Sequence, residues 1–525
     1  MDTKALRQKI LDLAIRGKLV PQDPNDEPAE VLLERIREQK QQMFKEGKLK
    51  KKDIKNDTII FKGEDNLHYE KFQDGTVKCI EDEIPFEVPE GWAWCKLNDI
   101  YNFIDYRGAT PTKITNGIPL VTAKNVKSGY IDYTIDDYIS EEEFKERQQR
   151  GISKKGDILF TTEAPLGNAA LADMEKFSAG QRLITFQQYG SKDELINYVM
   201  LMFILSDFFQ QQLYVNKTGS TVAGIKAAIL KTLWIPVPPY NEQLRISNTL
   251  KSAINLIDSI SKNKEILSTS ISNTKSKILD LAIRGKIVPQ DPNDEPASVL
   301  LERIRAEKEE LIKQGKIKRD KKESVIFKGD DNSYYLRTGG VEESLEDWRF
   351  DDLPETWKIC CLWELCDYGD CINVNTEDIA EDAWILDLED IEKDTGTVLK
   401  KVTKAQRNSV STKHKFHSGQ VLYSKLRPYL NKVVLSDADG YCTSEILPLE
   451  FKNCVLPEYA RYYLMSGTFI AYANHCSYGV KMPRLGTTDG KKAIFSLPPL
   501  SEQKRIVETI DFCFMQLNKI SEALA

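Results

Sequence analysis

The feature that most constrains this chain is an internal repeat. The run KILDLAIRGKLVPQDPNDEPAEVLLERI, from Lys9 to Ile36, returns almost unchanged from Lys277 to Ile304. The run PPYNEQLRI, from Pro238 to Ile246, is matched in the same way by PPLSEQKRI, from Pro498 to Ile506. Repeats at so long a spacing predict two copies of one module, which agrees with a length of 525 residues, several times that of a common single domain.

The sequence between the repeated runs has diverged. Residues 92–235 and 357–495 share only a loose pattern, such as KGDILF from Lys155 to Phe160 against SGQVLY from Ser418 to Tyr423. Near-identical frames around dissimilar inserts indicate that the frame performs one task twice while each insert performs its own, as in a reader with two heads. The alternative is a recent duplication whose interiors drifted without any functional difference between them.

A long helix is predicted after the first PPYNEQLRI run. No Pro or Gly interrupts the sequence from Glu242 to Arg284, and Gly285 follows as a C-terminal stop. Apolar residues recur there in alternating steps of four and three, which is the seam of a left-handed coiled coil. These residues are Ile246, Leu250, Ala253, Ile257, Ile260, Leu267, Ile271, Ile278 and Leu281. The sequence therefore predicts one helix about 65 Å long.

The two ends of the chain each predict half of a second such helix. The C-terminal residues 501–525 begin the same seam at Ile506 and Ile510, and the N-terminal residues 1–18 supply its ending. The chain then reads as a ring of two modules that is circularly permuted at mid-helix, with pseudo-two-fold symmetry and antiparallel long helices. The alternative treats residues 1–18 as an unrelated surface helix.

The expected fold class is α+β, with two mixed α/β heads joined by two long antiparallel coiled-coil helices. Strands are expected at Ile118 to Thr122, Asp157 to Thr161, Val421 to Ser424 and Ala493 to Leu497. The expected divisions are 1–18 for the N-terminal half of the distal helix, 19–89 for a linker with an amphipathic helix, 90–240 for head one, 241–285 for the central long helix, 286–350 for a second linker with an amphipathic helix, 351–500 for head two, and 501–525 for the distal helix.

Composition excludes several classes of protein. A net charge of −7 argues against a chain that coats nucleic acid without selection. No apolar run is long enough to span a bilayer and the N-terminus lacks a secretory apolar core, so no membrane partner and a cytoplasmic location are expected. The densest cysteine group, at Cys360, Cys361, Cys366 and Cys371, lacks zinc-site spacing, so no metal is expected.

Charge is uneven within the heads. From Lys400 to Leu435 there are nine Lys or Arg and no acidic residue, and from Phe208 to Asn241 three lysines surround the small polar sequence KTGST without any acid. Cations hold phosphates, and Arg, Asn and Gln can read base edges in the major groove, so both segments suit DNA. A solvated basic face would look the same.

Catalytic motifs are not found. The sequence has no phosphate-binding glycine loop, because no Gly-Lys pair is followed by Ser or Thr, and it has no nucleophile-elbow or zinc-protease pattern. Val237-Pro238-Pro239-Tyr240 resembles an amino-methyltransferase motif only superficially, since valine cannot accept a hydrogen bond from a target amine. No catalytic residue and no cofactor are therefore predicted in this chain, although scattered carboxylates leave a metal-dependent nuclease open.

Taken together, LPPLSEQKRI before a long helix, KILDLAIRGKLVPQ at the end of one, and IPLVTAKNVKSGYID and ISKKGDILFTTEAPLGNAAL in head one resemble the DNA specificity subunit of type I restriction-modification systems. The resemblance covers nearly the whole chain. It implies that each head is a target recognition domain that reads one half of a bipartite double-stranded DNA site, and that the long helices set the spacing. It also implies two modification subunits, which bind S-adenosylmethionine and methylate adenine, and restriction subunits that use ATP and Mg²⁺. A non-catalytic chain is then expected.

Base-reading residues in that family vary with the target, so the DNA-contact residues are chosen here on their chemistry. The candidates are Lys124, Asn125, Asn168, Lys217, Ser220 and Thr221 in head one, and Lys425, Arg427, Tyr429, Asn431, Lys481 and Arg484 in head two. Two other functions stay open, a non-catalytic scaffold whose heads bind proteins and a metal-dependent nuclease.

Overall fold

The computed structural model describes residues 2–54, 57–106, 110–134, 137–189, 194–219, 223–316, 323–331, 333–345, 352–407 and 410–524. The chain divides into two compact units, Met1–Asn263 and Lys264–Ala525. One 43-residue helix, α9 (Tyr240–Ala282), contributes its first part to unit 1 and its second part to unit 2. The helix covers nearly all of the run for which the spacing of apolar residues predicts it.

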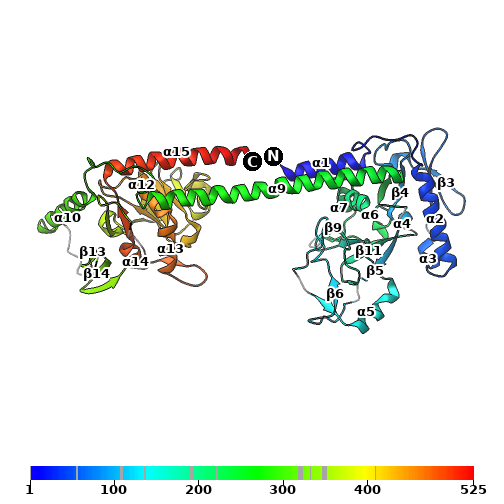
Figure 1. Ribbon diagram of the computed structural model, residues 1–525, viewed down its shortest axis with the longest axis horizontal. Coiled ribbons are helices and arrows are strands. Elements are labelled where there is room, and N and C mark those ends of the chain that lie inside the picture. The colour runs from blue at the N-terminus through cyan, green and yellow to red at the C-terminus, as the bar shows by residue number, and fades with distance from the viewer. Residues whose placement is uncertain are drawn as a thin grey trace. The chain divides into compact units, whose positions relative to one another are not determined.

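Unit 1 begins with helices and continues as a mixed α/β head (Figure 1). Its elements before α9 are α1 (Thr3–Ile15), α2 (Ala29–Lys45), α3 (Lys51–Ile54), β1 (Ile59–Lys62), β2 (His68–Lys71), β3 (Val77–Cys79), β4 (Ala93–Lys96), α4 (Leu97–Ile100), β5 (Tyr101–Asp105), β6 (Ile118–Val121), β7 (Tyr138–Ile139), α5 (Glu141–Arg147), β8 (Ile158–Thr162), β9 (Leu166–Leu171), β10 (Ser178–Ala179), β11 (Leu183–Gln188), α6 (Asn197–Ile204), α7 (Asp207–Val215), α8 (Ala227–Leu230) and β12 (Trp234–Val237). The central sheet has the order β5-β11-β8-β9, and a smaller sheet has the order β10-β6-β7.

The largest hydrophobic cluster of unit 1 joins its head to the repeated frame. Every residue of β8 is buried, and α6 carries the sequence NYVMLMFI, which is apolar on nearly all sides and is buried from Val199 to Ile204. The same core includes Leu11 of α1, Leu32 of α2 and Leu250 of α9. The repeated frame is therefore packed directly against head one.

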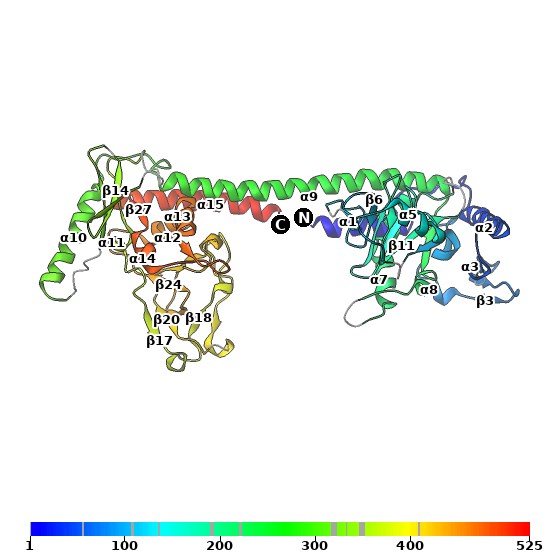
Figure 2. The same ribbon diagram turned by 90° about the horizontal axis from the view of Figure 1, so that it is seen from below.

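Unit 2 repeats this plan with other side chains (Figure 2). Its elements after α9 are α10 (Ala297–Lys313), β13 (Ser324–Lys328), β14 (Tyr334–Thr338), β15 (Val341–Ser344), β16 (Lys358–Cys361), α11 (Leu362–Leu365), β17 (Ile372–Val374), β18 (Trp384–Leu386), β19 (Val402–Thr403), β20 (Lys413–Phe416), β21 (Val421–Ser424), β22 (Val433–Leu435), β23 (Gly440–Thr443), β24 (Ile446–Leu449), α12 (Pro457–Leu464), α13 (Gly467–His475), β25 (Ser477–Tyr478), β26 (Arg484–Leu485), α14 (Thr487–Lys492), β27 (Ile494–Leu497) and α15 (Leu500–Leu524). Its sheets include β22-β21-β24 and β17-β20-β23-β18-β19.

The strands of the two heads correspond one to one at the centre. Strand β8 pairs with β9 and β11 in head one, and β21 pairs with β22 and β24 in head two, all antiparallel. In the second sheet of each head β6 runs parallel to β10, as β18 runs parallel to β23. The two heads thus share one backbone plan although their sequences have diverged.

The segments predicted as linkers hold more structure than expected. Beside the predicted amphipathic helix, each contains a three-stranded antiparallel sheet, β1-β2-β3 in one unit and β13-β14-β15 in the other. Their strands have at most five residues and are mostly half-exposed, so the two-residue alternation was too short to stand out. The description of 19–89 and 286–350 as linkers with a helix is corrected accordingly.

The repeated frame is locked in the same way in each unit. In unit 1 the indole Nε1 of Trp92 donates to Glu242 Oε2 at 2.9 Å, and Gln22 Nε2 donates to Glu242 Oε1 at 3.0 Å. In unit 2 Trp357 Nε1 donates to Glu502 Oε2, again at 2.9 Å, and Gln290 Nε2 to Glu502 Oε1. Burial raises the pKa of both glutamates. This buried network fixes the PQDPNDEP turn to the start of a long helix.

Each part of α9 has an antiparallel neighbour within its own unit. Arg7 of α1 forms an ion pair with Asp258 of α9, while Gln22, further along the chain, reaches Glu242 near the helix start. In unit 2 Lys275 Nζ of α9 donates to Asn518 Oδ1 of α15 at 2.6 Å. Both views show α1 (blue) and α15 (red) alongside their parts of α9 (green) (Figures 1 and 2).

Candidate nucleic-acid interface

Three separate segments meet at the end of β8 in head one. The amide of Thr162 donates to the carbonyl of Arg182 at 2.9 Å, and the amide of Ile225 donates to the carbonyl of Thr162 at 3.0 Å. Thr218 and Gly224 exchange two backbone hydrogen bonds, which close a loop between them. We call this meeting point the junction of head one. The KTGST sequence singled out above begins with Lys217, just before this loop.

A cavity of about 630 Å³ lies at this junction. Its walls are formed by the ends of β5 and β8, the closed loop and the residues that lead into α8. They are Asp105, Thr162, Glu163, Thr218, Gly219, Gly224, Ile225, Lys226 and Ala227. A hollow that combines two carboxylates, a lysine and threonine hydroxyls can both donate and accept hydrogen bonds, which is what base edges in a groove require.

Head two builds the same junction. The amide of Lys425 donates to the carbonyl of Glu445 at 3.0 Å, and the amide of Leu485 donates to the carbonyl of Lys425 at 3.0 Å. Strands β25 and β26 pair antiparallel and close the loop between Tyr478 and Arg484. The two segments picked from the sequence of head two, one around Lys425 and one around Arg484, are therefore brought side by side.

The loops at the junction of head two present apolar as well as basic side chains. Tyr429, in the 3₁₀ turn Pro428–Leu430, is 47% exposed, and Lys481 is exposed. Tyr478 and Met482 are exposed too, and Val480 is fully exposed at the loop tip. Exposed aromatic and apolar side chains close together beside cations are a feature of many interaction sites.

Three of the picked asparagines serve the fold. Asn125 is buried, its Oδ1 accepts from Thr122, and its Nδ2 donates to the carbonyl of Asp132 at 2.9 Å. Asn168 Nδ2 donates to the carbonyl of Val126 at 3.0 Å. Asn431 is buried, has a left-handed backbone, and reaches the carbonyl of Met465. These geometries favour loop-shaping roles over base contact, because the amides are already used inside the heads.

The picked lysines of head one are accessible. Lys124 and Lys217 are both exposed, and the ammonium of Lys217 lies 5.3 Å from the ring centroid of Tyr214. Ser220 and Thr221 lie outside the described residues. Contact of these four residues with DNA stays a prediction.

The picked arginines of head two differ in their partners. Arg427 has a left-handed backbone at φ +50° and its amide donates to the carbonyl of Pro483 at 2.7 Å, which ties the two loops of the junction together. Arg484 forms an ion pair with Glu445 at 2.8 Å. The carboxylate was not expected there from sequence alone, because Glu445 is distant in the chain.

The acid-free segment of head two is not a single basic face. Lys401 pairs with Asp437 at 2.7 Å, and the guanidinium of Arg407 contacts Asp387 and Asp390. These acidic residues come from neighbouring turns that lie outside the segment in sequence. The acid-free segment is therefore partly neutralised in the fold, and its contact with DNA stays a prediction.

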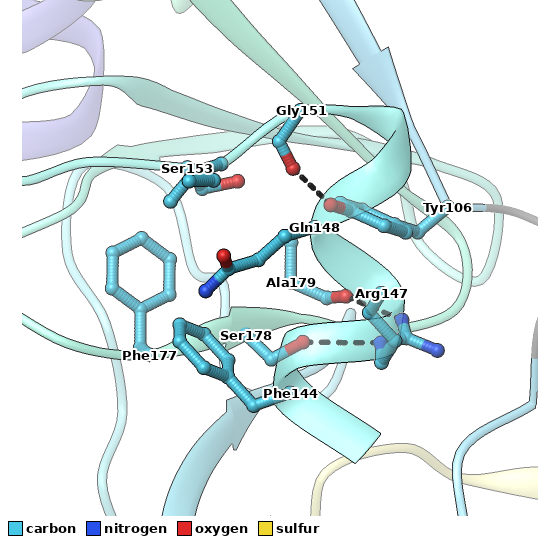
Figure 3. A pocket seen from close by; sticks show the side chains of 10 residues that line it. Tyr106, Phe144, Arg147, Gln148, Gly151, Ser153, Phe177, Ser178 and Ala179 are labelled. Carbon is cyan, nitrogen blue, oxygen red and sulfur yellow. Dashed lines mark hydrogen bonds between the residues drawn. The ribbon is translucent and has the colours of Figure 1, made fainter. Parts of the chain in front are cut away.

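A second hollow in head one is too small for a ligand (Figure 3). It lies beside α5 and β10 and has a volume of about 10 Å³, room for about one water molecule. Arg147 lines it, with Nε donating to Ser178 Oγ at 3.1 Å and a terminal nitrogen donating to the carbonyl of Ala179 at 2.9 Å. The buried guanidinium links α5 to the smaller sheet, and we assign it a structural role.

Several cysteines and one histidine of head two lie in its interior. Burial raises the pKa of the Cys361 thiol to about 12, and Cys360 and Cys366 are also buried. His414 is buried with Nδ1 at 2.8 Å from the carbonyl oxygen of Ile446, and burial lowers its pKa. Among the described residues no group of three or more His, Cys, Asp or Glu could hold a metal ion. No helix in the described parts of the chain has the length and apolarity to cross a bilayer.

Comparison with known proteins agrees with this geometry. The family model described as the type I restriction modification DNA specificity domain matches the chain twice, at residues 89–268 and 354–523. The chain belongs to the type I restriction-modification DNA specificity family. Each match contains one head and a stretch of the long helix that follows it, so the family unit is the repeated module, and the resemblance stated from the sequence is confirmed.

Individual members of this specificity family are similar over almost the whole chain. The EcoAI specificity subunit of Escherichia coli is 28% identical, with 98% of this chain and 90% of the relative covered. The EcoEI specificity subunit of Escherichia coli is 26% identical, with 99% and 90% covered. A chain solved in work on complex assembly and conformational transition of the type I restriction-modification system shares the fold, with a TM-score of 0.54 at 16% identity over 84% of this chain and 94% of that one.

Proposed function

We propose that this chain reads a bipartite double-stranded DNA target for a type I restriction-modification complex, one half-site with each head. The observation that carries the proposal is the junction, which has the same backbone hydrogen bonds in both heads but different exposed side chains. A conserved scaffold with variable exposed groups is what two readers of different sequences need.

The repeated frame supports a partner that binds twice. The PQDPNDEP turn is mostly exposed in both units, and Val31 and Val299, at the same position of the repeat, are 43% and 39% exposed. Packing does not constrain exposed positions, so packing alone does not explain their identity in both copies. Asp23 and Glu27 make the turn acidic, which suits a protein partner better than phosphate.

We assign this surface to two modification subunits. In the proposed complex those subunits bind S-adenosylmethionine and methylate adenine, and restriction subunits supply ATP- and Mg²⁺-dependent cleavage in the cytoplasm. The chain itself then acts without catalysis, as the part that selects the sequence. Val31→Glu or Val299→Glu alone should leave a complex with one modification subunit, and the double variant should leave none, which light scattering of the purified complex would measure. Full occupancy in the double variant would contradict the assignment.

We further propose that the two long helices act as a spacer. The seam of apolar residues in α9 and the antiparallel contacts of α1 and α15 with their parts of α9 support a coiled coil that is circularly permuted at mid-helix. The two terminal helices have 13 and 25 residues, against 43 in α9, as two pieces of one such helix would. A continuous helix without Pro or Gly resists bending, so its length would set the gap between the half-sites.

The experiment for the proposed function is selection of bound duplexes from a random library, with the chain alone and with its modification subunit. Two short motifs separated by a fixed gap of random bases are expected. One contiguous motif would mean that only one head reads DNA. No enrichment even with the partner would overturn the proposal and leave a scaffold whose heads bind proteins.

A further inference from the structure

Three positions are equivalent in the two junctions. The first follows the end of β8 or β21, and is Glu163 in head one and Leu426 in head two. It forms a backbone bridge with the third position, which is Gly224 or Arg484. The second position, Arg182 or Glu445, accepts a backbone hydrogen bond from the residue just before the first. The matching bonds establish the equivalence without any reference to side chains.

The side chains at these positions differ in a systematic way. In head one Arg182 Nε lies 3.1 Å from Glu163 Oε1, so positions one and two hold an ion pair. In head two a terminal nitrogen of Arg484 lies 2.8 Å from Glu445 Oε1, so positions two and three hold it. Each junction therefore has one arginine–glutamate pair, and the second position carries opposite charges in the two heads.

Folding stability is a weak explanation for these pairs. The side chains of Arg182 and Glu163 are 53% and 44% exposed, and those of Arg484 and Glu445 are 32% and 24% exposed. Ion pairs that water reaches contribute little to folding. The buried strands beside the pairs carry apolar residues in both heads. The ion pair, in contrast, occupies positions one and two in head one and positions two and three in head two. Such a change is expected for groups whose partner differs between the heads.

The geometry of Arg484 leaves a recognition edge open. Glu445 takes the side of the guanidinium that carries Nε, at 3.1 Å, and one terminal nitrogen, at 2.8 Å. The other terminal nitrogen, on the side of the aliphatic chain, donates to the carbonyl of Met482 at 3.2 Å. Two N–H hydrogens, one on each terminal nitrogen, remain at the outer end of the guanidinium group. Two parallel donors of this kind match the O6 and N7 acceptors of guanine in the major groove.

We propose that Arg182 in head one and Arg484 in head two each bind a guanine of their half-site, and that Glu163 and Glu445 are positioning residues that hold the guanidinium planes. This assignment rests on the proposed function, since it names the bases that the two heads read. Because the arginine stands at the second position in head one and at the third in head two, the bound guanine would lie differently relative to the backbone of each head. Two heads of one fold would then read different half-sites.

The test is the same duplex selection, made with the chain assembled with its modification subunit. Arg182→Gln should abolish the preference for guanine at one position of one half-site, and Arg484→Gln at one position of the other, each by about 5- to 150-fold. All remaining positions should keep their preferences. Arg337→Gln is the matched control, because Arg337 forms a comparably exposed pair with Glu342 on β14 and β15, away from the junction.

A second variant separates the recognition of guanine from the contribution of the positive charge to affinity. Arg484→Lys keeps the cation but loses the fork, so total affinity and its salt dependence should hold while guanine selectivity at that position falls. Glu445→Gln should weaken the same preference without moving it. If the wild-type chain selects two half-sites and the arginine variants leave both unchanged, or lower every position equally, this inference is overturned. If the wild-type chain selects no motif, the proposed function itself has failed.

Discussion

Gly17→Ala should destabilise unit 1 more than Gly47→Ala, although both glycines end a helix with a left-handed backbone. Their φ angles are +66° and +71°. A Cβ on Gly17 would lie 2.3 Å from Cγ and 2.7 Å from Cδ of Pro89, whereas a Cβ on Gly47 would meet nothing within 4 Å. Both variants lose about 1–2 kcal/mol from the left-handed backbone. Overpacking adds about 1–3 kcal/mol at Gly17 alone, so about 2–5 kcal/mol is expected there.

Unit 2 contains the same pair and serves as an internal repeat of the experiment. Gly285 would place a Cβ 2.5 Å from Cγ of Pro354, and Gly315 would place one in open space. Because two units need not unfold together, amide hydrogen exchange of fragments from α1, α2 and α10 is the suitable assay. Equal losses of protection in Gly17→Ala and Gly47→Ala would refute the steric argument, since only the backbone penalty would then remain.

Three further predictions follow from particular residues. Burial raises the pKa of Asp99 to about 6 from a usual 3.8, so the folded state holds a proton that the unfolded chain loses. The stability of unit 1 should therefore fall as pH rises from about 4 to 6. In Asp99→Asn the urea midpoint of unfolding should no longer change with pH across that range. Lys217→Gln should weaken binding to all duplexes alike and lower the slope of log affinity against log salt by about one, and a change at one base position only would contradict a phosphate contact. Four residues inserted into α9 should lengthen the selected gap by about two base pairs, since they add about 6 Å of helix, and an unchanged gap would exclude the helix as spacer.

The frame was predictable because it combines long-period and local signals. An uninterrupted run from Glu242 to Arg284 with regular apolar spacing leaves few alternatives to a helix, and the repeat doubles the observation. The same reasoning failed for β1 to β3 and β13 to β15, whose short strands alternate over too few residues. Pairing over such lengths depends on tertiary neighbours, which no local pattern records.

The sequence pointed to segments that the fold brings together, while the choice of DNA-contact residues within them stays a prediction. Loops rich in small polar and basic residues around Lys217, Lys425 and Lys481 lie at the junctions. An asparagine is ambiguous in such a choice, because a short amide that can contact a base can equally bond its own backbone, as Asn125 does. Glu163 and Glu445 were missed, since a search for cations passes over the carboxylates that orient them.

The division between a constant frame and variable heads has a physical origin in where polar groups are placed. Glu242 and Glu502 are buried, so a substitution would leave the Trp92 or Trp357 indole donor unsatisfied inside the protein. Both copies of the frame therefore keep a glutamate at this position. The junction pairs are exposed in head one and partly exposed in head two, where water can reach either partner and a change is tolerated by the fold. The backbone of the junction is fixed by hydrogen bonds that do not depend on side-chain identity, from Thr162 to Arg182 and from Lys425 to Glu445. A fold built in this way can change what a head reads without changing how the head is held.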